Sequence, residues 1–277
     1  MSITITIQLE KLEGYSIGPD SYWVPRFLQQ YTLFDPDQVL ADINDVAPWT
    51  DPQHADFRYR GHVLARQKFF LNDAPIEAPA DQPPALLHRY FYPGFQYGSM
   101  SSYRPFRAVP VVHEIATFLQ QEMEFGETGV SFNHVIGTRY RDATDNIGWH
   151  ADKTQDIRPD TPIVMLSLGE TRELQLGKPH GKNGKPTKLT HAIPFAHGDL
   201  FVLGPRTNEQ MMHRIAKVAQ ERLVKREGGE VAPRVSLVFR DIGTQITLDN
   251  ARQKAQRVRR DRERRQQDRK RKREGHE

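Results

Sequence analysis

The chain of 277 residues contains no cysteine. This excludes disulfide bonds and cysteine-ligated zinc, and it fits a reducing compartment. No apolar run approaches the roughly 18 residues that a membrane span needs. The N-terminal segment MSITITIQLEKLEGY also lacks the basic region and apolar core of a secretory signal. We therefore expect no membrane association and a cytoplasmic location, or a nuclear one if the source is eukaryotic.

Positive charge is concentrated at the C-terminal end of the chain. Residues 251–277 contain 13 Lys and Arg against 5 Asp and Glu, whereas residues 1–250 contain 26 against 30. Because Val258 is the one large apolar residue in 251–277, we expect residues 246–277 to form a basic tail that is disordered or a solvated helix. Such a tail favours contact with nucleic acid, and RKRKR is typical of a basic import signal. A purely solubilising role is the alternative.

The clearest helical pattern covers residues 108–125, where Pro110 is expected at the start and apolar residues from Val112 to Leu119 recur on one face. From residue 130 onward, short strand-like runs are separated by Gly, Pro, Asn and Asp, which favours a sandwich or barrel over a parallel α/β sheet. These runs are VSFNHVIGTRY, IGWHAD, PIVMLSLG, RELQLG, THAIPF, DLFVLG and RVSLVFRDI.

His150 and Asp152 lie two residues apart in a strand-like run, so both side chains are expected on the same side. Together with His213 they form a candidate set of two histidines and one carboxylate, which can bind Fe(II) on one face and leave other positions open. Trp149, which is adjacent to His150, is expected to point to the opposite strand face and into the core.

His-x-Asp is a weak pattern, and the chain contains it three times. The copy at His54 lies in the polar stretch TDPQHADF, which is typical of a loop. The copy at His197 precedes Asp199, and the intervening Gly198 indicates a tight turn before a buried strand. The copy at His150 is therefore the favoured metal motif.

The last strand-like run places Arg234, Ser236, Val238 and Arg240 on one face and apolar residues on the other. Buried arginine is rare without a partner, and a ligand carboxylate would accept a bidentate pair of hydrogen bonds. The alternatives are that both guanidinium groups face solvent or pair with acidic residues of a neighbouring strand.

These segments together resemble the AlkB family of Fe(II)/2-oxoglutarate-dependent dioxygenases, and most of all its eukaryotic DNA-dealkylating members. The resemblance rests on FNHVIGTRYRDATDNIGWHADKTQDIRPDTPIVMLSLGETREL, HGDLFVLGPRTNEQMMH and APRVSLVFR, which follow one another with matching spacing over residues 131–242. The family implies a mainly β fold, a double-stranded β-helix or jelly-roll barrel, here with supporting N-terminal helices and the basic tail. We expect residues 1–110 to form an N-terminal extension and substrate lid, in one structural unit with a core of residues 111–245.

The resemblance implies that His150, Asp152 and His213 bind Fe(II), and that 2-oxoglutarate and O2 are consumed. Arg234 would bind the distal carboxylate of 2-oxoglutarate, and Arg240 would lie near its metal-binding end. Its implied activity is oxidative dealkylation, in which hydroxylation of an N-methyl group releases formaldehyde.

Three further residues would face the cosubstrate. Tyr140 would donate a hydrogen bond to it. Thr138 and Ser236 stand where the family commonly has Asn, so their side chains have a shorter reach.

For the substrate, the resemblance implies an alkylated nucleobase in DNA or RNA, which must be taken out of its stack. Phe95 and Tyr97 are candidates for stacking on the base, with core packing as the alternative, and Arg66 is a candidate for approaching the pocket or a phosphate. DNA-repair members often have acidic residues directly after the metal Asp, where this chain has KTQ, so Asp156 is the nearest carboxylate.

Two other functions remain open at this point: a hydroxylase of a nucleobase, protein side chain or small molecule, and a catalytically silent nucleic-acid-binding scaffold. The sequence does not indicate the oligomeric state.

Overall fold

The computed structural model describes most of the chain. The described residues are 7–8, 13–49, 58–59, 62–63, 66–73, 86–90, 103–124, 129–142, 144–180, 184–218 and 233–247, with single helical positions at 250, 253, 260, 264 and 267.

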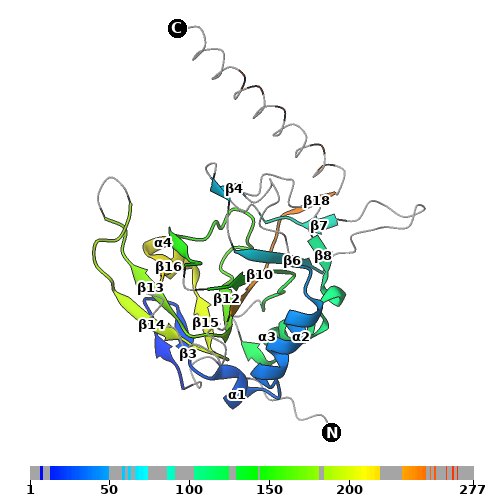
Figure 1. Cartoon of the computed structure of the whole chain (residues 1–277), viewed down its shortest axis with the longest axis horizontal. Coiled ribbons are helices and arrows are strands. Elements are labelled where there is room, and N and C mark those ends of the chain that lie inside the picture. Colours follow the sequence, from blue (N-terminus) through cyan, green and yellow to red (C-terminus); the bar gives the residue numbers. More distant parts are fainter. Residues whose placement is uncertain are drawn as a thin grey trace, which may run out of the picture.

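Two antiparallel sheets make up the body of the molecule (Figure 1). The larger sheet has eight strands, in the spatial order β2 (Tyr15–Ser16), β3 (Tyr22–Val24), β15 (Leu200–Leu203), β12 (Ile163–Gly169), β17 (Arg234–Arg240), β10 (His134–Tyr140), β6 (Gln67–Asn72) and β8 (Tyr103–Pro105). Only the pairing of β6 with β8 in this sheet is parallel. The smaller sheet has the order β11 (Ile147–His150), β16 (Met212–Ile215), β13 (Arg172–Gly177) and β14 (His191–Phe195).

Three two-stranded pairs and several helices complete the described structure. The pairs are β1 (Ile7–Gln8) with β9 (Met123–Glu124), β18 (Gln245–Thr247) with β7 (Leu86–His88), and β4 (Arg58–Tyr59) with β5 (His62–Val63). The helices are α1 (Phe27–Tyr31), α2 (Pro36–Val46), α3 (Pro110–Glu122) and α4 (Pro205–Gln210), with a 3-10 turn η3 (Phe106–Ala108) before α3. Within the described part of the chain, no helix is long and apolar enough to cross a membrane.

The large sheet separates two hydrophobic cores. One face packs against the helices, through Val39 and Ile43 of α2 and Ile115 of α3. The other face packs against the small sheet, where Met165 of the large sheet and Leu174 of the small sheet share one cluster. The alternation of side chains along each strand produces this separation, because successive residues point to opposite faces. The expected jelly-roll architecture is confirmed.

The helix predicted for residues 108–125 is present as α3, which begins at Pro110 as expected. Val112, Ile115 and Leu119 of its apolar face are fully buried, and Phe118 is partly buried. Seven predicted strand-like runs correspond to β10 to β15 and β17.

The N-terminal region contributes more to the core than an extension would. Its strand β6 pairs with β10 over six residues, from Gln67 opposite Arg139 to Asn72 opposite His134. Close packing joins the two strands, since a Cβ built on Gly137 would lie 2.1 Å from the ring of Phe69. The expected boundary at residue 110 therefore divides a continuous sheet, consistent with a single structural unit.

The expected tail boundary at residue 246 falls inside a strand. Ile246 is 7% exposed and lies in β18, which pairs with β7. The described positions beyond it, Asn250, Gln253, Arg260, Arg264 and Gln267, are helical and exposed.

The expected core position of Trp149 is wrong. Its side chain is only partly buried, and the guanidinium of Arg214 lies 4.5 Å over its ring. Its neighbour over the ring is Arg214 of β16, so the side chain lies on the outer face of the small sheet and not in the core.

Candidate metal and cosubstrate site

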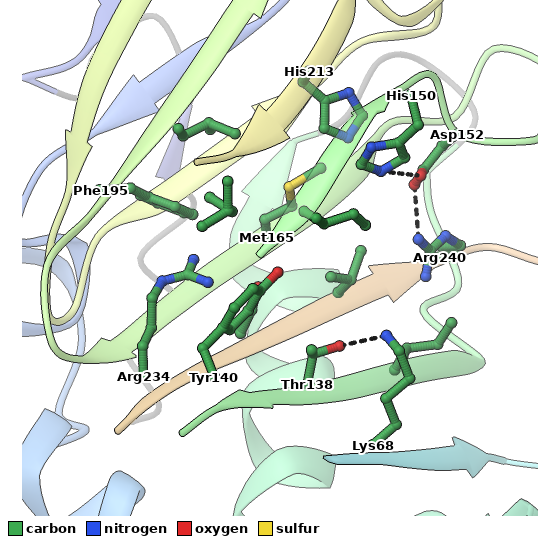
Figure 2. Close-up of a pocket in the computed structure, with 16 residues that line it drawn as sticks. Lys68, Thr138, Tyr140, His150, Asp152, Met165, Phe195, His213, Arg234 and Arg240 are labelled. Carbon is green, nitrogen blue, oxygen red and sulfur yellow. Dashed lines mark hydrogen bonds and ion pairs between the residues drawn. The ribbon is translucent and has the colours of Figure 1, made fainter. Parts of the chain in front are cut away.

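Strand pairing in the small sheet brings the predicted metal ligands together. His150 at the end of β11 lies directly opposite His213 on β16, and their ring centroids are 4.2 Å apart. Asp152 follows two residues after β11 ends, and its Oδ1 lies 3.6 Å from His150 Nε2. One donor atom from each residue lies within 4.8 Å of the others (Figure 2), so the three side chains could hold one metal ion.

Each of these donors is oriented by a neighbour. His150 Nδ1 donates a hydrogen bond of 2.8 Å to the carbonyl oxygen of Gly148, which leaves Nε2 as the free ligand atom. Arg240 donates from Nη2 to Asp152 Oδ2 at 2.7 Å, which leaves Oδ1 facing the histidines. Arg240, which the resemblance placed near the cosubstrate, therefore also orients the candidate metal ligand Asp152.

Helix α4 fixes the backbone of Asp152. Asn208 accepts a hydrogen bond of 2.9 Å from the Asp152 amide, and its own side-chain amide donates to the Asp152 carbonyl oxygen at 2.9 Å. The Asn208 side chain is 4% exposed, so water competes little for these bonds. A single buried amide thus holds both backbone groups of the carboxylate ligand.

The protonation states suit metal binding. Burial, with a smaller effect from the neighbouring His150, lowers the pKa of His213 to about 3. Burial also lowers the pKa of His150. Burial alone would raise the pKa of Asp152, but Arg240, His213 and His150 outweigh it and hold this pKa below the usual range. Two neutral imidazoles and one carboxylate are the forms that bind a divalent metal.

Arg234 lies at the opposite end of the pocket from Asp152 and Arg240 (Figure 2). It is 1% exposed, and Nε donates to the hydroxyl of Ser167 at 3.0 Å. Among the described residues its Nη1 has no hydrogen-bond partner. Burial lowers the pKa of Arg234 to about 10, so the group remains a cation at neutral pH. A buried guanidinium without a carboxylate partner fits an anionic ligand.

The pocket between these two ends combines polar and apolar walls. Its empty space is about 580 Å³, which includes the open mouth. Its lining includes the expected cosubstrate residues Tyr140, Thr138 and Ser236. The rest of the lining is Lys68, Ile136, Ile147, His150, Asp152, Met165, Leu174, Phe195, His213, Ile215, Arg234, Val238 and Arg240.

The predicted substrate residues are less well placed than the metal and cosubstrate residues. Arg66 is 6% exposed and lies 5.8 Å over the ring of Tyr140, but it is not part of the pocket lining. Asp156 also lies outside the lining; it is buried, and its carboxylate accepts a hydrogen bond from Arg89. Phe95 and Tyr97 lie outside the described residues.

The other His-x-Asp copies are not part of this site. Gly198 has a φ of +83°, as expected for a turn between His197 and Asp199. Asp199 accepts hydrogen bonds from the Trp23 side chain and from the Arg26 amide, at 3.0 and 2.8 Å, so its role is structural. His54 lies outside the described residues.

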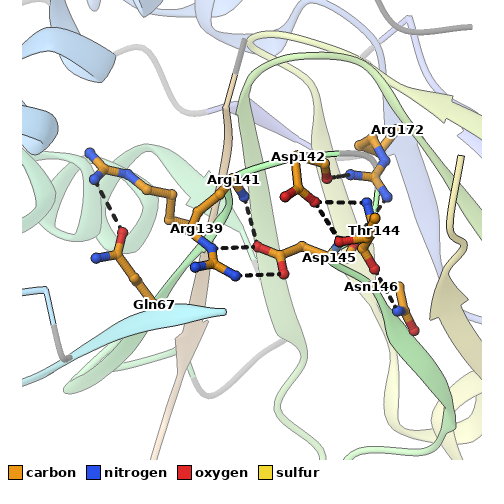
Figure 3. Close-up of polar contacts among 8 residues, drawn as sticks. All are labelled: Gln67, Arg139, Arg141, Asp142, Thr144, Asp145, Asn146 and Arg172. Carbon is orange, nitrogen blue, oxygen red and sulfur yellow. Dashed lines mark hydrogen bonds and ion pairs between the residues drawn. The ribbon is translucent and has the colours of Figure 1, made fainter. Parts of the chain in front are cut away.

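The loop that leads into β11 is held by a buried guanidinium (Figure 3). Arg172 of β13 donates to the carbonyl oxygens of Asp142 and Asp145 and to that of Ala216, at 3.1, 2.8 and 2.7 Å. Asp145 is also paired with Arg141, with 3.0 Å between Oδ2 and Nε. These bonds fix the start of the strand that carries His150 relative to β13.

Two residues of the site were missed in the sequence. One is Lys68, which lines the pocket. Residues two apart in a strand share a face, so the prediction that Arg66 approaches the pocket could have been extended to Lys68. Asn208 had no such signal, because its contact with Asp152 joins residues 56 positions apart.

Comparison with known proteins adds a family assignment to this geometry. The model of the 2OG-Fe(II) oxygenase superfamily matches residues 36–240. The human protein named DNA oxidative demethylase ALKBH2 is 30% identical over 136 residues, which are 48% of this chain and 47% of that protein. Human alpha-ketoglutarate-dependent dioxygenase alkB homolog 3 is 30% identical over 48% of this chain and 44% of its own length.

A longer match is found with the Arabidopsis thaliana protein named DNA oxidative demethylase ALKBH2, which is 26% identical over 80% of this chain and 66% of its own length. A solved structure titled "The structure of OsALKBH1" aligns with a TM-score of 0.49 and 16% sequence identity. The alignment covers 82% of this chain and 99% of that chain. This similarity is too low to support the family assignment. The chain matches about half the length of the human relatives. From the family model and these relatives, this chain belongs to the 2OG-Fe(II) oxygenase superfamily, and its resemblance to AlkB-family members is confirmed.

Proposed function

We propose that this chain is an Fe(II)- and 2-oxoglutarate-dependent dioxygenase that removes alkyl groups oxidatively from nucleobases in DNA or RNA. The observation that carries the proposal is that one pocket has a candidate metal site with three donor residues at one end and Arg234 at the other. Arg234 is buried there and has no carboxylate partner among the described residues. Relatives named DNA oxidative demethylase support the choice of nucleobases.

Residues at the two ends of the pocket would have different roles. His150, His213 and Asp152 would bind the metal, and Arg240 keeps Asp152 ionised and oriented. Arg234 would bind the distal carboxylate of 2-oxoglutarate. When bound, Fe(II) and 2-oxoglutarate supply an oxidation that converts 2-oxoglutarate and O2 into succinate and CO2 and inserts one oxygen atom into a substrate C–H bond.

A substrate N-methyl group hydroxylated in this way leaves as formaldehyde and restores the unmodified amine. Apolar side chains between the two polar ends, Ile136, Met165 and Val238, limit the access of water to the region between Arg234 and the metal ligands. We further propose that Phe95, Tyr97 and Arg66 contact the extracted base or its phosphate, that the basic tail binds nucleic acid, and that the protein acts in the cytoplasm or, in a eukaryote, in the nucleus.

Hydroxylation of another substrate is the second candidate function. Among the described residues that line the pocket, Asp152 is the one carboxylate, and Asp156 is engaged by Arg89. The described lining therefore offers no second carboxylate, besides Asp152, that could bind an alkylated base. This favours a different base or a different substrate class.

The test measures succinate and formaldehyde from protein loaded anaerobically with Fe(II), then given O2, 2-oxoglutarate and methylated oligonucleotides. We expect both products with the wild type and neither with the His150→Ala variant. Succinate without formaldehyde would favour the hydroxylase. If metal-loaded protein released no succinate, the oxygenase proposal would be wrong and a silent nucleic-acid-binding scaffold would replace it.

A further inference from the structure

Met165 supplies the one sulfur atom among the described residues that line the pocket. It lies in the middle of β12, is 7% exposed, and belongs to the apolar cluster between the two sheets. Figure 2 shows its side chain pointing into the pocket. A thioether is polarizable and can be oxidised, so Met165 differs in chemistry from the aliphatic side chains beside it.

Strand register places Met165 nearer to the metal end of the pocket than to the Arg234 end. It lies directly opposite Val238 of β17, and opposed residues share a sheet face. Val238 is two residues from Arg240, which donates to Asp152, and four residues from Arg234. At about 3.3 Å per residue, the level of Met165 is roughly 7 Å from that of Arg240 and roughly 13 Å from that of Arg234.

Across the pocket, Met165 faces the sheet that carries both candidate histidine ligands. That small sheet holds His150 on β11 and His213 on β16, and its residue Leu174 shares a cluster with Met165. Packed sheets lie about 10 Å apart, and the long, unbranched Met side chain extends into this space. Figure 2 shows the sulfur on the side of the pocket that the histidines line.

Two other methionines allow location to be separated from exposure. Met211 is also 7% exposed and lies in the same cluster, but it is not part of the pocket lining, and the Thr190 hydroxyl donates to its sulfur at 3.9 Å. Met212 is more exposed and alternates with His213, so it lies on the outer face of the small sheet. A diffusing oxidant would therefore reach Met212 first and would not distinguish Met165 from Met211.

We propose that Met165 is a self-oxidation site, whose thioether is converted to the sulfoxide when Fe(II), 2-oxoglutarate and O2 are present without substrate. This inference rests on the proposed function and adds a modification site to its pocket. One atom of O2 enters succinate and the other bonds to the Met165 sulfur, while 2-oxoglutarate releases CO2. The sulfur and 2-oxoglutarate lose two electrons each, O2 gains four, and no proton is gained or lost.

The sulfoxide would alter the pocket that produced it. Oxidation of methionine replaces a flexible apolar group by a polar, chiral one. Met165, Ile136 and Val238 form an apolar wall between the two polar ends of the pocket, and a sulfoxide oxygen there would draw water into it. Turnover without substrate should therefore slow as Met165 becomes modified.

The experiment incubates the Fe(II)-loaded wild type with 2-oxoglutarate, isotopically labelled O2 and catalase, without substrate, and locates oxidised methionines by peptide mass spectrometry. We expect Met165 to gain the mass of one labelled oxygen atom while succinate is released. Met211 and Met212 should gain none. Omission of 2-oxoglutarate should abolish the label, and hydrogen peroxide in place of O2 and 2-oxoglutarate should modify Met212 first.

A pair of variants links the modification to the loss of activity. The rate of succinate release by the wild type should fall in proportion to the fraction of Met165 that carries the label. Met165→Leu, which nearly conserves the apolar volume, should keep its own starting rate over the same time. Met211→Leu is the matched control and should slow as the wild type does. If Met165→Leu does not fold, the labelling of the wild type still decides the question.

Three results would overturn the inference. Succinate release by a wild type whose Met165 stays unmodified would refute the self-oxidation and leave the proposed function intact. Equal label at Met165 and Met211, or label at Met165 only when catalase is omitted, would assign the oxidation to a diffusing oxidant. No succinate from the metal-loaded wild type would refute both proposals together.

Discussion

At the scale of single residues, Arg234 is a buried charge in the pocket that has no carboxylate partner among the described residues. Arg234 is fully buried, and its described partners are the Ser167 hydroxyl, a side-chain hydrogen bond with Tyr140, and the rings of Tyr140 and Phe195, at 5.0 and 5.3 Å. Removing a buried charge that lacks a counter-ion costs little stability or increases it. Such a group is therefore explained better by ligand binding than by folding.

Replacement of Arg234 by Met should separate these two roles. We expect the dissociation constant for 2-oxoglutarate to rise at least 100-fold, because the charge-assisted pair with the distal carboxylate is lost. The melting temperature of the unliganded protein should stay the same or increase. A titration and a melting curve on the same preparation measure both. A variant that melts much earlier would show that Arg234 is structural.

The buried His134 and the partly buried His88 should shift the pH dependence of stability in opposite directions. Burial, with help from Arg240, lowers the pKa of His134 well below its ordinary value of about 6.5, whereas a hydrogen bond to Asp73 raises that of His88. His134 stays neutral when folded, so its contribution is present above pH 6.5 and is lost as the pH falls below it. The contribution of His88 is present below pH 6.5 and is lost as the pH rises through its raised pKa.

Relative to the wild type, His134→Asn should therefore lose stability less steeply as the pH falls from 6.5 to 4, and His88→Asn should lose stability less steeply as the pH rises above 6.5. One titrating group changes this slope by at most about 1.4 kcal/mol per pH unit. Urea unfolding of the metal-free protein across both pH ranges measures the slopes. Equal slopes in all three proteins would contradict the assignment.

At the scale of secondary-structure elements, the metal set depends on how three segments are held together. Strand pairing sets His150 against His213, Arg172 fixes the loop before β11, and α4 holds Asp152 through Asn208. The carboxylate comes after the end of β11, so hydrogen bonds from other elements replace the strand ladder there.

Asn208→Ala tests this dependence on α4. Both hydrogen bonds to the Asp152 backbone would be lost, and loss of such an orienting residue typically lowers metal affinity about 10- to 100-fold. Competition with a metal indicator measures the affinity. Gln210→Ala, at an exposed position on the same helix, is the control and should bind metal normally. Metal affinity that stays at the wild-type value in Asn208→Ala would rule out this positioning role.

At the scale of the whole molecule, the excess positive charge and the candidate site lie in different parts of the chain. The pocket lies in a part with a net charge of −4, and residues 251–277 carry +8. An acidic body repels a phosphate backbone, so attraction to nucleic acid would come from the tail.

Truncation after Asn250 should weaken binding to single-stranded oligonucleotides and reduce the slope of log affinity against log salt, because fewer counterions are released. Binding of 2-oxoglutarate should be unchanged, since the cut leaves β18 and the buried Ile246 in place. Fluorescence anisotropy at several salt concentrations measures the slope. An unchanged slope would exclude the tail from nucleic-acid binding.

The sequence by itself determined the elements whose patterns are local. Period-2 alternation placed Arg234 and Arg240 on one face, the apolar spacing located α3, and the His-x-Asp motif with its context identified His150 and Asp152. The predicted helix and strand faces agree with the structure because each depends on residues that are neighbours in the chain, where dihedral preferences and side-chain direction decide the outcome.

Only the tertiary structure decided which distant residues meet. The pairing of β6 with β10 brought Lys68 beside Thr138, 70 positions away, and the packing of α4 brought Asn208 to Asp152. The same packing pairs Arg240 with Asp152, and it leaves Arg234 without a carboxylate partner among the described residues. Strand register and helix docking come from summed packing over many residues, which no short stretch of sequence encodes.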